Sequence, residues 1–188
     1  MKAARESWRQ KQPGLDAKKL VFIDETGLNT KMTRLYGRSL RNQRCVALVP
    51  HGHWQTTSMI AGLRHDGIVA PFLIAGAVDA QVFTAYLQHV LCSELRPGDI
   101  VVLDNLSTHK IATVKTLIQA RGASVYYLPA YSPDLNPIEM AFAKFKAHLR
   151  QSAARTSENL QTSVSLALSS FQPNQCLSFF RHAHYVSI

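Results

Sequence analysis

Two short apolar runs, each followed directly by an aspartate, constrain the fold of this sequence more than any other feature. Residues 20–23 read Leu-Val-Phe-Ile before Asp24, and residues 100–103 read Ile-Val-Val-Leu before Asp104. Continuous apolar runs of this length, rich in β-branched residues, are typical of strands buried on both faces of a sheet. Each aspartate is therefore expected at the carboxyl end of a buried strand, which is the edge where open α/β sheets bind ligands.

The two aspartates come close together if their strands are parallel neighbours. Two carboxylates in contact repel unless a proton or a cation lies between them. The alternative is that each aspartate only begins a turn or caps a helix, which is the commoner outcome for a single strand-ending aspartate. Because the pattern occurs twice, it favours a shared site that includes Asp24 and Asp104.

The rest of the hydrophobic periodicity predicts an antiparallel meander followed by alternating helices and strands. Further strands are expected at residues 45–49, 53–63, 67–74 and 124–128. Helices are expected at residues 79–95, 108–120, 138–150 and 157–171, and beyond Pro173. The order, an antiparallel meander followed by βαβ units, predicts an α/β fold class. Five of the six runs are expected in one mixed five-stranded sheet, with a three-stranded antiparallel meander beside two parallel strands, flanked by helices.

The 188 residues are enough for one hydrophobic core and leave little for a second domain. We expect residues 1–19 to form a short lead-in and residues 20–156 to form the core of the domain. Residues 157–188 are expected to be a helical extension of the same domain.

Composition excludes several classes of protein. With 46% hydrophobic and 18% charged residues the chain is neither disordered nor fibrous, and no apolar run is long enough to cross a bilayer. Its three cysteines are far apart, which disfavours a disulfide framework and a zinc site. The N-terminus lacks the apolar stretch of a secretory signal, so a cytoplasmic protein without a membrane partner is expected.

Basic residues are concentrated in the first part of the chain. The formal net charge is +9, and residues 1–50 hold 11 Lys and Arg against four Asp and Glu. Four arginines, interleaved with Tyr36 and Gly37, fall in a segment without acidic residues: Arg34, Arg38, Arg41 and Arg44. Such a segment suits contacts with nucleic-acid phosphates, although a solvated loop explains it equally well.

A third acidic residue, Glu139, ends the segment 131–139 (Tyr-Ser-Pro-Asp-Leu-Asn-Pro-Ile-Glu). Asn136 is a good helix N-cap, and Glu139, three residues later, stands where the glutamate of a capping box would. The helical pattern offers a second role, because Glu139 shares one stripe of the helix with Lys146 and Arg150. A carboxylate followed by two cations suits a metal site with DNA running past it.

Three carboxylates without a His or Cys ligand set indicate hard divalent cations, Mg²⁺ or Mn²⁺. Two such ions about 4 Å apart activate an attacking oxygen and stabilise the leaving oxygen of a phosphodiester. On a basic domain this donor set favours phosphoryl transfer on nucleic acid. Two residues near Asp104 are secondary candidates for the site. Asn105 could orient Asp104, or it could only form a turn. His109 could approach the site, or it could only begin a helix.

Three segments together resemble the catalytic domain of bacterial insertion-sequence transposases of the mariner superfamily. They are residues 22–27 (Phe-Ile-Asp-Glu-Thr-Gly), residues 102–110 (Val-Leu-Asp-Asn-Leu-Ser-Thr-His-Lys) and residues 131–139, and the resemblance extends from about residue 20 to residue 185. That family has an RNase H-like fold with an Asp-Asp-Glu triad. The resemblance therefore implies Asp24, Asp104 and Glu139 as catalytic residues and metal ligands, and the 34 residues between the last two match the family's spacing.

The resemblance implies an enzyme that uses Mg²⁺ or Mn²⁺, with two ions expected, to cleave transposon ends and transfer the strands into target DNA, typically at TA. The DNA contacts would come from the basic residues of three segments: Arg34, Arg38, Arg41, Arg44, Lys110, Lys146 and Arg150.

Family members usually carry N-terminal helix-turn-helix modules that recognise the transposon ends. Fewer than 20 residues precede the first expected strand here, too few for one such module. We therefore expect either that the recognition domain is encoded in an upstream reading frame or that the chain is a truncated remnant. Paired-end chemistry makes a homodimer reasonable, and action on DNA implies a nucleoid-associated location. Two alternatives stay open: an RNase H-like nuclease without strand transfer, and a non-catalytic DNA-binding remnant.

Overall fold

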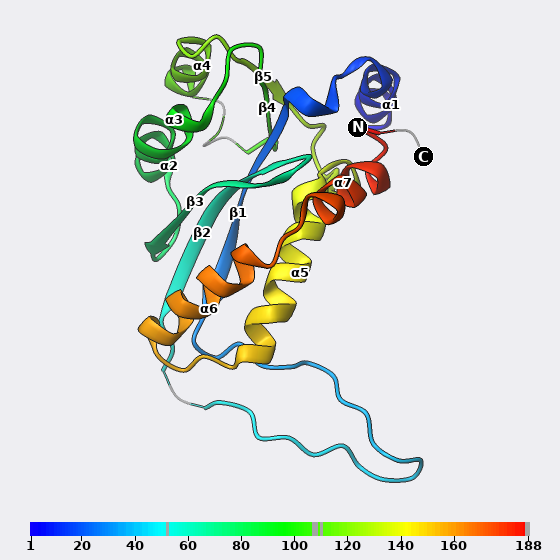
Figure 1. Ribbon diagram of the computed structural model, residues 1–188, viewed down its shortest axis with the longest axis vertical. Coiled ribbons are helices and arrows are strands. Elements are labelled where there is room, and N and C mark those ends of the chain that lie inside the picture. The colour runs from blue at the N-terminus through cyan, green and yellow to red at the C-terminus, as the bar shows by residue number, and fades with distance from the viewer. Residues whose placement is uncertain (52, 107–108, 110, 187–188) are drawn as a thin grey trace.

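The computed structural model describes residues 1–51, 53–106, 109 and 111–186 (Figure 1). Five strands form one sheet in the order β3-β2-β1-β4-β5. The strands are β1 (Leu20–Asn29), β2 (Thr56–Arg64), β3 (Gly67–Ala75), β4 (Ile100–Leu103) and β5 (Ser124–Tyr127). β1, β2 and β3 form an antiparallel meander, and β4 pairs in parallel with both β1 and β5. The predicted mixed five-stranded sheet is confirmed.

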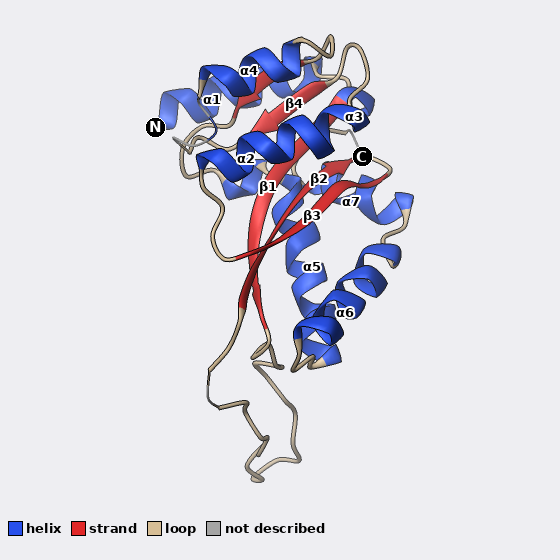
Figure 2. Ribbon diagram, turned by 90° about the vertical axis from the view of Figure 1, so that its left-hand side faces the viewer, coloured by secondary structure: helices blue, strands red, loops and turns tan. Residues whose placement is uncertain are grey.

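Helices cover both faces of the sheet (Figure 2). They are α1 (Lys2–Lys11), α2 (Ala80–Tyr86), α3 (Cys92–Glu94), α4 (Ala112–Gln119), α5 (Pro137–Ser152), α6 (Ser157–Ser169) and α7 (Pro173–His182). A π-helical turn, Leu87–Leu91, joins α2 to α3. α2 and α4 pack on one face of the sheet, and α1, α5, α6 and α7 contribute to the core on the other.

β1 is the central strand, and its alternating side chains explain its continuous apolar pattern. Val21 and Ile23 pack into the core beneath α2 and α4, whereas Leu20 and Phe22 pack into the core beneath α5 and α7. All four side chains are fully buried. Because both faces of this strand are covered, polar residues are excluded until the chain reaches Asp24.

β1 continues beyond the point where the sequence predicts its end. Its parallel pairing with β4 stops at Ile23 opposite Leu103, but its antiparallel pairing with β2 continues as far as Asn29. The prediction that Asp24 ends its strand was therefore wrong, whereas Asp104 does follow directly on β4. Asp24 is still the first β1 residue beyond the β4 pairing, so the two aspartates extend from adjacent positions in register.

Three other local predictions also differ from the structure. The strand expected at residues 45–49 is absent, because Val46 and Leu48 are exposed in an irregular segment with no neighbouring strand among the described residues. The helix expected from residue 108 begins at Ala112, because Ile111 has an extended backbone; the expected cap, Ser107, lies outside the described residues. The lead-in contains a helix, α1, which buries Trp8.

Residues 30–51, here called the basic loop, leave the end of β1 and extend away from the rest of the molecule (Figure 1). Arg155, just after α5, donates hydrogen bonds to the carbonyl oxygens of Thr30 and Met32. The base of the basic loop is therefore fixed to the C-terminal end of α5. Within the described ranges, no helix combines the length and the hydrophobicity needed to cross a bilayer.

The C-terminal helices share the core of the sheet. Phe180 of α7 packs edge-to-face on Phe22 of β1, with ring centroids 5.4 Å apart, and Leu160 and Val164 of α6 join the same cluster. We propose that residues 157–188 unfold together with residues 20–156 as one unit.

Replacing Phe180 with alanine is expected to lower the free energy of unfolding by about 3–5 kcal/mol, because the ring is fully buried against β1. Chemical denaturation followed by both circular dichroism and tryptophan fluorescence should give one coincident transition. The control is Leu166→Ala on α6, whose side chain is 67% exposed and whose replacement should have little effect. Separate transitions for the two probes would contradict a single unit.

Candidate active site

One pocket of about 350 Å³ brings together the three acidic residues that the sequence singles out. Asp24 comes from β1, Asp104 from the end of β4, and Glu139 from the first turn of α5. The register of β1 against β4 positions the two aspartates, and the start of α5 positions the glutamate. The remaining lining residues come from the segments after β4 and after β5: Asn105, Leu106, Leu128, Pro129, Ala130, Tyr131, Ser132, Pro133 and Asn136.

Asp24 is buried, with 8% of its surface exposed, and it is held by amides. Its Oδ1 accepts a hydrogen bond from the backbone amide of Glu25 at 2.8 Å, and its Oδ2 accepts one from Nδ2 of Asn136 at 3.0 Å. The pKa of Asp24 is raised to about 7, mainly by burial and in smaller part by the nearby carboxylates of Glu139, Asp104 and Glu25, while the amide hydrogen bond acts in the opposite direction. Because neighbouring carboxylates contribute to this shift, a positive charge in the pocket would stabilise the ionised form of Asp24.

Asn136 takes a different role from the one that its position suggests. It stands at the N-cap of α5, with Pro137 at the first helical position as predicted, but its side chain does not cap the helix. It donates to Asp24 instead, and its own Oδ1 is buried without a hydrogen-bond partner in the described structure. Glu139 is exposed at the mouth of the pocket. The first turn of α5 therefore directs an amide and a carboxylate to the same site.

His109 is fully buried between two carboxylates. Its Nδ1 donates to Oδ1 of Asp104 at 2.6 Å, and its Nε2 faces Oε2 of Glu25 at 3.3 Å as an ion pair. Burial alone would lower the pKa of His109, but Asp104 and Glu25 together raise it to about 9. The ring also packs at a tilt against the ring of Phe83, with centroids 4.2 Å apart. At neutral pH an imidazolium therefore stabilises the carboxylate of Asp104 and fixes its orientation.

Glu25 is a member of the site that sequence reasoning missed. Its carboxylate lies against His109, with Oε2 3.3 Å from Nε2 of the ring. The adjacent acidic pair Asp24-Glu25 was the only available signal, and nothing local indicates that a histidine 84 positions later fills the space between Glu25 and Asp104. Asn105 is exposed and lines the pocket.

The donor set fits a hard divalent cation. The pocket offers carboxylate oxygens from three residues and the unpartnered buried Oδ1 of Asn136, which are the ligand atoms that Mg²⁺ and Mn²⁺ prefer. In the arrangement seen here, no three His, Cys, Asp or Glu side chains of the described residues converge closely enough to hold one ion.

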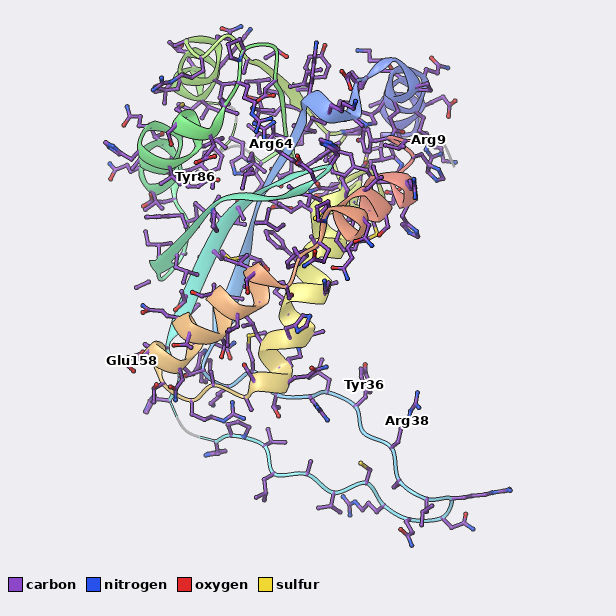
Figure 3. All side chains as sticks on the ribbon, in the orientation of Figure 1. Arg9, Tyr36, Arg38, Arg64, Tyr86 and Glu158 are labelled. Atoms are coloured by element: carbon purple, nitrogen blue, oxygen red, sulfur yellow. The ribbon has the colours of Figure 1, made fainter. Side chains whose placement is uncertain are left out.

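The predicted DNA-contacting residues lie in two places. Arg34, Arg38, Arg41 and Arg44 are exposed on the basic loop, and Figure 3 shows Tyr36 and Arg38 projecting from that loop into solvent. Lys146 and Arg150 lie half-buried on α5, on the stripe that begins at Glu139. Lys110 lies outside the described residues. Since Arg155 fixes the base of the loop to the end of α5, the two basic surfaces adjoin.

Helix α1 and the C-terminus hold the segment between β5 and α5 in place. Arg5 donates to the carbonyl oxygen of Tyr131, to Oγ of Ser132 and to both carboxylate oxygens of Asp134. Tyr185 accepts a hydrogen bond from Trp8 Nε1 and donates one to the carbonyl of Leu135, both at 2.8 Å. The pocket wall that carries Asn136 is therefore held in place by contacts from α1 and from Tyr185.

Comparison with known proteins identifies a family and a fold. Residues 19–161 match the family described as DDE superfamily endonuclease. No curated protein matches the chain by sequence.

Solved structures of the Mos1 transposase share the fold. The Mos1 paired-end complex with the left transposon end matches with a TM-score of 0.72 and 16% identity, over 97% of this chain and 56% of that chain. The mariner Mos1 paired-end complex with Mg matches with a TM-score of 0.71 and 18% identity, over 97% of this chain and 57% of that chain. The catalytic domain of Mos1 mariner transposase matches with a TM-score of 0.66 and 16% identity, over 97% of this chain and 84% of that chain. The chain thus spans little more than half of the longer Mos1 chains, and its mixed sheet is RNase H-like, as in the Mos1 catalytic domain.

Replacing Tyr185 with phenylalanine is expected to destabilise the protein by about 1–3 kcal/mol, because the buried indole of Trp8 and the carbonyl of Leu135 both lose their partner. Hydrogen exchange should also accelerate in α1. The control is Tyr36→Phe, whose side chain is 91% exposed and whose change should have an effect within about 0.5 kcal/mol. Unchanged exchange in α1 would show that Tyr185 does not anchor that helix.

Proposed function

Given that the chain belongs to the DDE superfamily of endonucleases, we propose that it is a transposase catalytic domain that cleaves DNA and joins DNA strands with the help of a divalent cation. The observation that carries this proposal is the pocket in which a buried Asp24 meets two further carboxylates and an unpartnered amide oxygen. The Mos1 complexes, which are solved with a transposon end and with Mg, support the assignment by analogy.

Asp24, Asp104 and Glu139 would hold the cation. Bound there, Mg²⁺ or Mn²⁺ would supply the positive charge that offsets the developing charge on a phosphodiester and lowers the pKa of an attacking hydroxyl. Asn136 holds Asp24 by one oxygen, and His109 holds Asp104, so two of the three ligands are oriented before substrate arrives. Glu139 stays exposed at the mouth, where the substrate would enter.

The basic surfaces would hold the DNA backbone. The stripe that runs from Glu139 to Lys146 and Arg150 follows α5 away from the pocket for about 16 Å, at 1.5 Å per residue. It leads to the base of the basic loop, whose arginines are free of nearby acidic residues in sequence. A duplex bound along α5 would therefore meet positive charge from the site to the loop.

The finer features of the proposal come from the sequence resemblance. They are membership of the bacterial insertion-sequence branch, strand transfer into TA target sites and the use of two ions. Action on paired ends would also require a homodimer and an end-recognition domain of the helix-turn-helix type. A nuclease on the same fold that cuts without strand transfer is the second candidate.

In the presence of Mn²⁺ or Mg²⁺, the protein is expected to nick DNA that carries the element's terminal repeats, and EDTA should abolish the reaction. Asp24→Asn, Asp104→Asn and Glu139→Gln should each lower the rate by at least about a hundredfold, because each change removes negative charge needed to hold the cation. Gel assays of labelled oligonucleotides measure both cleavage and joining to a target duplex.

The outcomes of this assay separate the candidate functions. Cleavage without joining would favour the plain nuclease. Full activity of Glu139→Gln would assign that residue a structural role only. If the wild-type protein bound DNA but never cleaved it, even with an end-recognition domain supplied, the enzyme assignment would be refuted and the binding remnant retained.

Removing the charges of Arg38 and Arg41 together is expected to weaken DNA binding and to lower the slope of log affinity against log salt by about 2. The matched control removes two exposed charges at the opposite end of the molecule, Lys115 on α4 and Arg121 just after it (Figure 1). Fluorescence anisotropy at several salt concentrations measures both. An equal loss of slope in the control would mean that the basic loop makes no specific contribution.

A further inference from the structure

A hollow of about 410 Å³ lies between α1 and the residues that follow α7. Its described lining residues are Arg9 of α1, Gln12, Pro13 and His184. The buried side chain of Gln12 donates a hydrogen bond to the carbonyl oxygen of Ala183 at 2.8 Å, so the two walls of the hollow are fixed to each other. None of these lining residues is acidic, and both Arg9 and His184 carry N–H donors. The hollow is therefore suited to an anion.

Arg9 carries a positive charge that its surroundings balance only in part. It lies 3.6 Å from Oδ2 of Asp134, and that carboxylate already forms a two-point ion pair with Arg5, at 2.7 and 2.9 Å. Two positive groups and one negative group leave a net charge of +1 in this cluster. Like charges at such distances repel, so a further anion beside Arg9 would stabilise the arrangement. The side chain of Arg9 is 53% exposed and is accessible to an anion from the hollow.

Basic residues outnumber acidic residues throughout this part of the chain. Residues 1–19 hold six Lys and Arg against two Asp and Glu, and no Asp or Glu follows Glu158 in the sequence. Arg181, in the last turn of α7, is also exposed. Figure 3 shows Arg9 at the opposite end of the molecule from Arg38 of the basic loop. This positive surface is therefore separate from the basic loop.

The hollow adjoins the acidic pocket through α1. Arg5 precedes Arg9 by about one helical turn, which is about 6 Å along the helix axis. Arg5 donates to Oγ of Ser132 at 2.8 Å, and Ser132 lines the acidic pocket. Successive phosphates of one DNA strand advance by about 3.4 Å along the duplex axis. A strand that leaves the pocket past Arg5 would therefore bring one of its next phosphates to the hollow.

We propose that the hollow binds one phosphate of the DNA backbone, with the guanidinium of Arg9 and the ring of His184 as donors. The proposal rests on the function proposed above, because it takes the bound strand to be the one that reacts in the acidic pocket. The planar guanidinium directs two N–H groups at one phosphate. Contacts of this kind carry no sequence information but fix the register of a protein on its DNA. The site would hold the DNA at the end of the molecule remote from the basic loop.

The first measurement is DNA affinity in EDTA, where cleavage is suppressed, by fluorescence anisotropy at several salt concentrations with duplexes that carry the element's terminal repeat. Arg9→Gln should weaken binding and lower the slope of log affinity against log salt by about 1, the value for one lost phosphate contact. Its melting temperature should stay close to that of the wild type, because an exposed ion pair contributes little to stability. The matched control is Lys11→Gln, which removes an exposed charge from a different face of the same helix and should leave the slope unchanged. An equal loss of slope in the control would overturn the site.

The second measurement identifies the phosphate. Each backbone phosphate near the end of the repeat is replaced in turn by an uncharged methylphosphonate. At one position this replacement should remove the difference in affinity between the wild type and Arg9→Gln, because both changes delete the same contact. His184→Asn should show the same dependence at the same position, since asparagine tolerates the left-handed backbone found there (φ +64°). A difference that persists at every position would overturn the proposal.

The remaining outcomes separate the phosphate site from a site for free anions and from the proposed function. If inorganic phosphate shifts the nuclear magnetic resonance signals of the His184 ring while Arg9→Gln binds DNA with the wild-type slope, the hollow takes free anions and the assignment to DNA is overturned. Cleavage by a protein whose DNA binding does not depend on Arg9 would likewise refute the phosphate site and leave the proposed function intact. Methylphosphonate coupling to Arg9 in a protein that never cleaves DNA with Mg²⁺ or Mn²⁺ would refute the proposed function and keep the phosphate site.

Discussion

Burying the carboxylate of Asp24 beside other carboxylates is the constraint on which the rest of the site depends. The sheet forces the arrangement, because β4 ends opposite Ile23 and leaves Asp24 and Asp104 at adjacent positions. The surrounding structure offsets the resulting repulsion only in part. The imidazolium of His109 offsets the negative charges of Asp104 and Glu25. Asp24 instead accepts hydrogen bonds from amides, and its pKa is raised to about 7, mainly by burial. A site with unbalanced negative charge and oxygen ligands is suited to bind a divalent cation.

The same constraint explains why both ends of the chain pack against one short segment. Asn136 can hold Asp24 only if the segment between β5 and α5 keeps its position, and that segment has little secondary structure of its own. Arg5 fixes its outer side, and the buried pair of Trp8 and Tyr185 fixes its inner side. Residues far from the carboxylates in sequence thus determine the geometry at Asp24 and Glu139.

Much of this architecture could be predicted from the sequence, because it depends on local pattern. The strand-forming runs before Asp24 and Asp104 and the Asn-Pro start of α5 are periodicity and capping signals, and each was found in the predicted element. The failures have a common physical cause. The length of β1 depends on its pairing with β2, the packing of α1 depends on Tyr185, and the ion pair of Glu25 with His109 depends on a distant element. Non-local contacts of this kind leave no periodic signal in the segments that make them. At residues 45–49 the apolar pattern was misleading, because those side chains are exposed and have no sheet to join.

Binding of Mn²⁺ to the free protein tests the central claim most directly. In nuclear magnetic resonance spectra, the paramagnetic ion broadens amide signals close to it, and the account predicts selective broadening around Asp24, Asp104 and Glu139. Broadening should disappear in the Asp24→Asn variant, which keeps a hydrogen-bonding side chain but loses the charge. Selective broadening elsewhere, or broadening at the pocket that is equally strong in Asp24→Asn, would contradict the assignment of these carboxylates as a cation site.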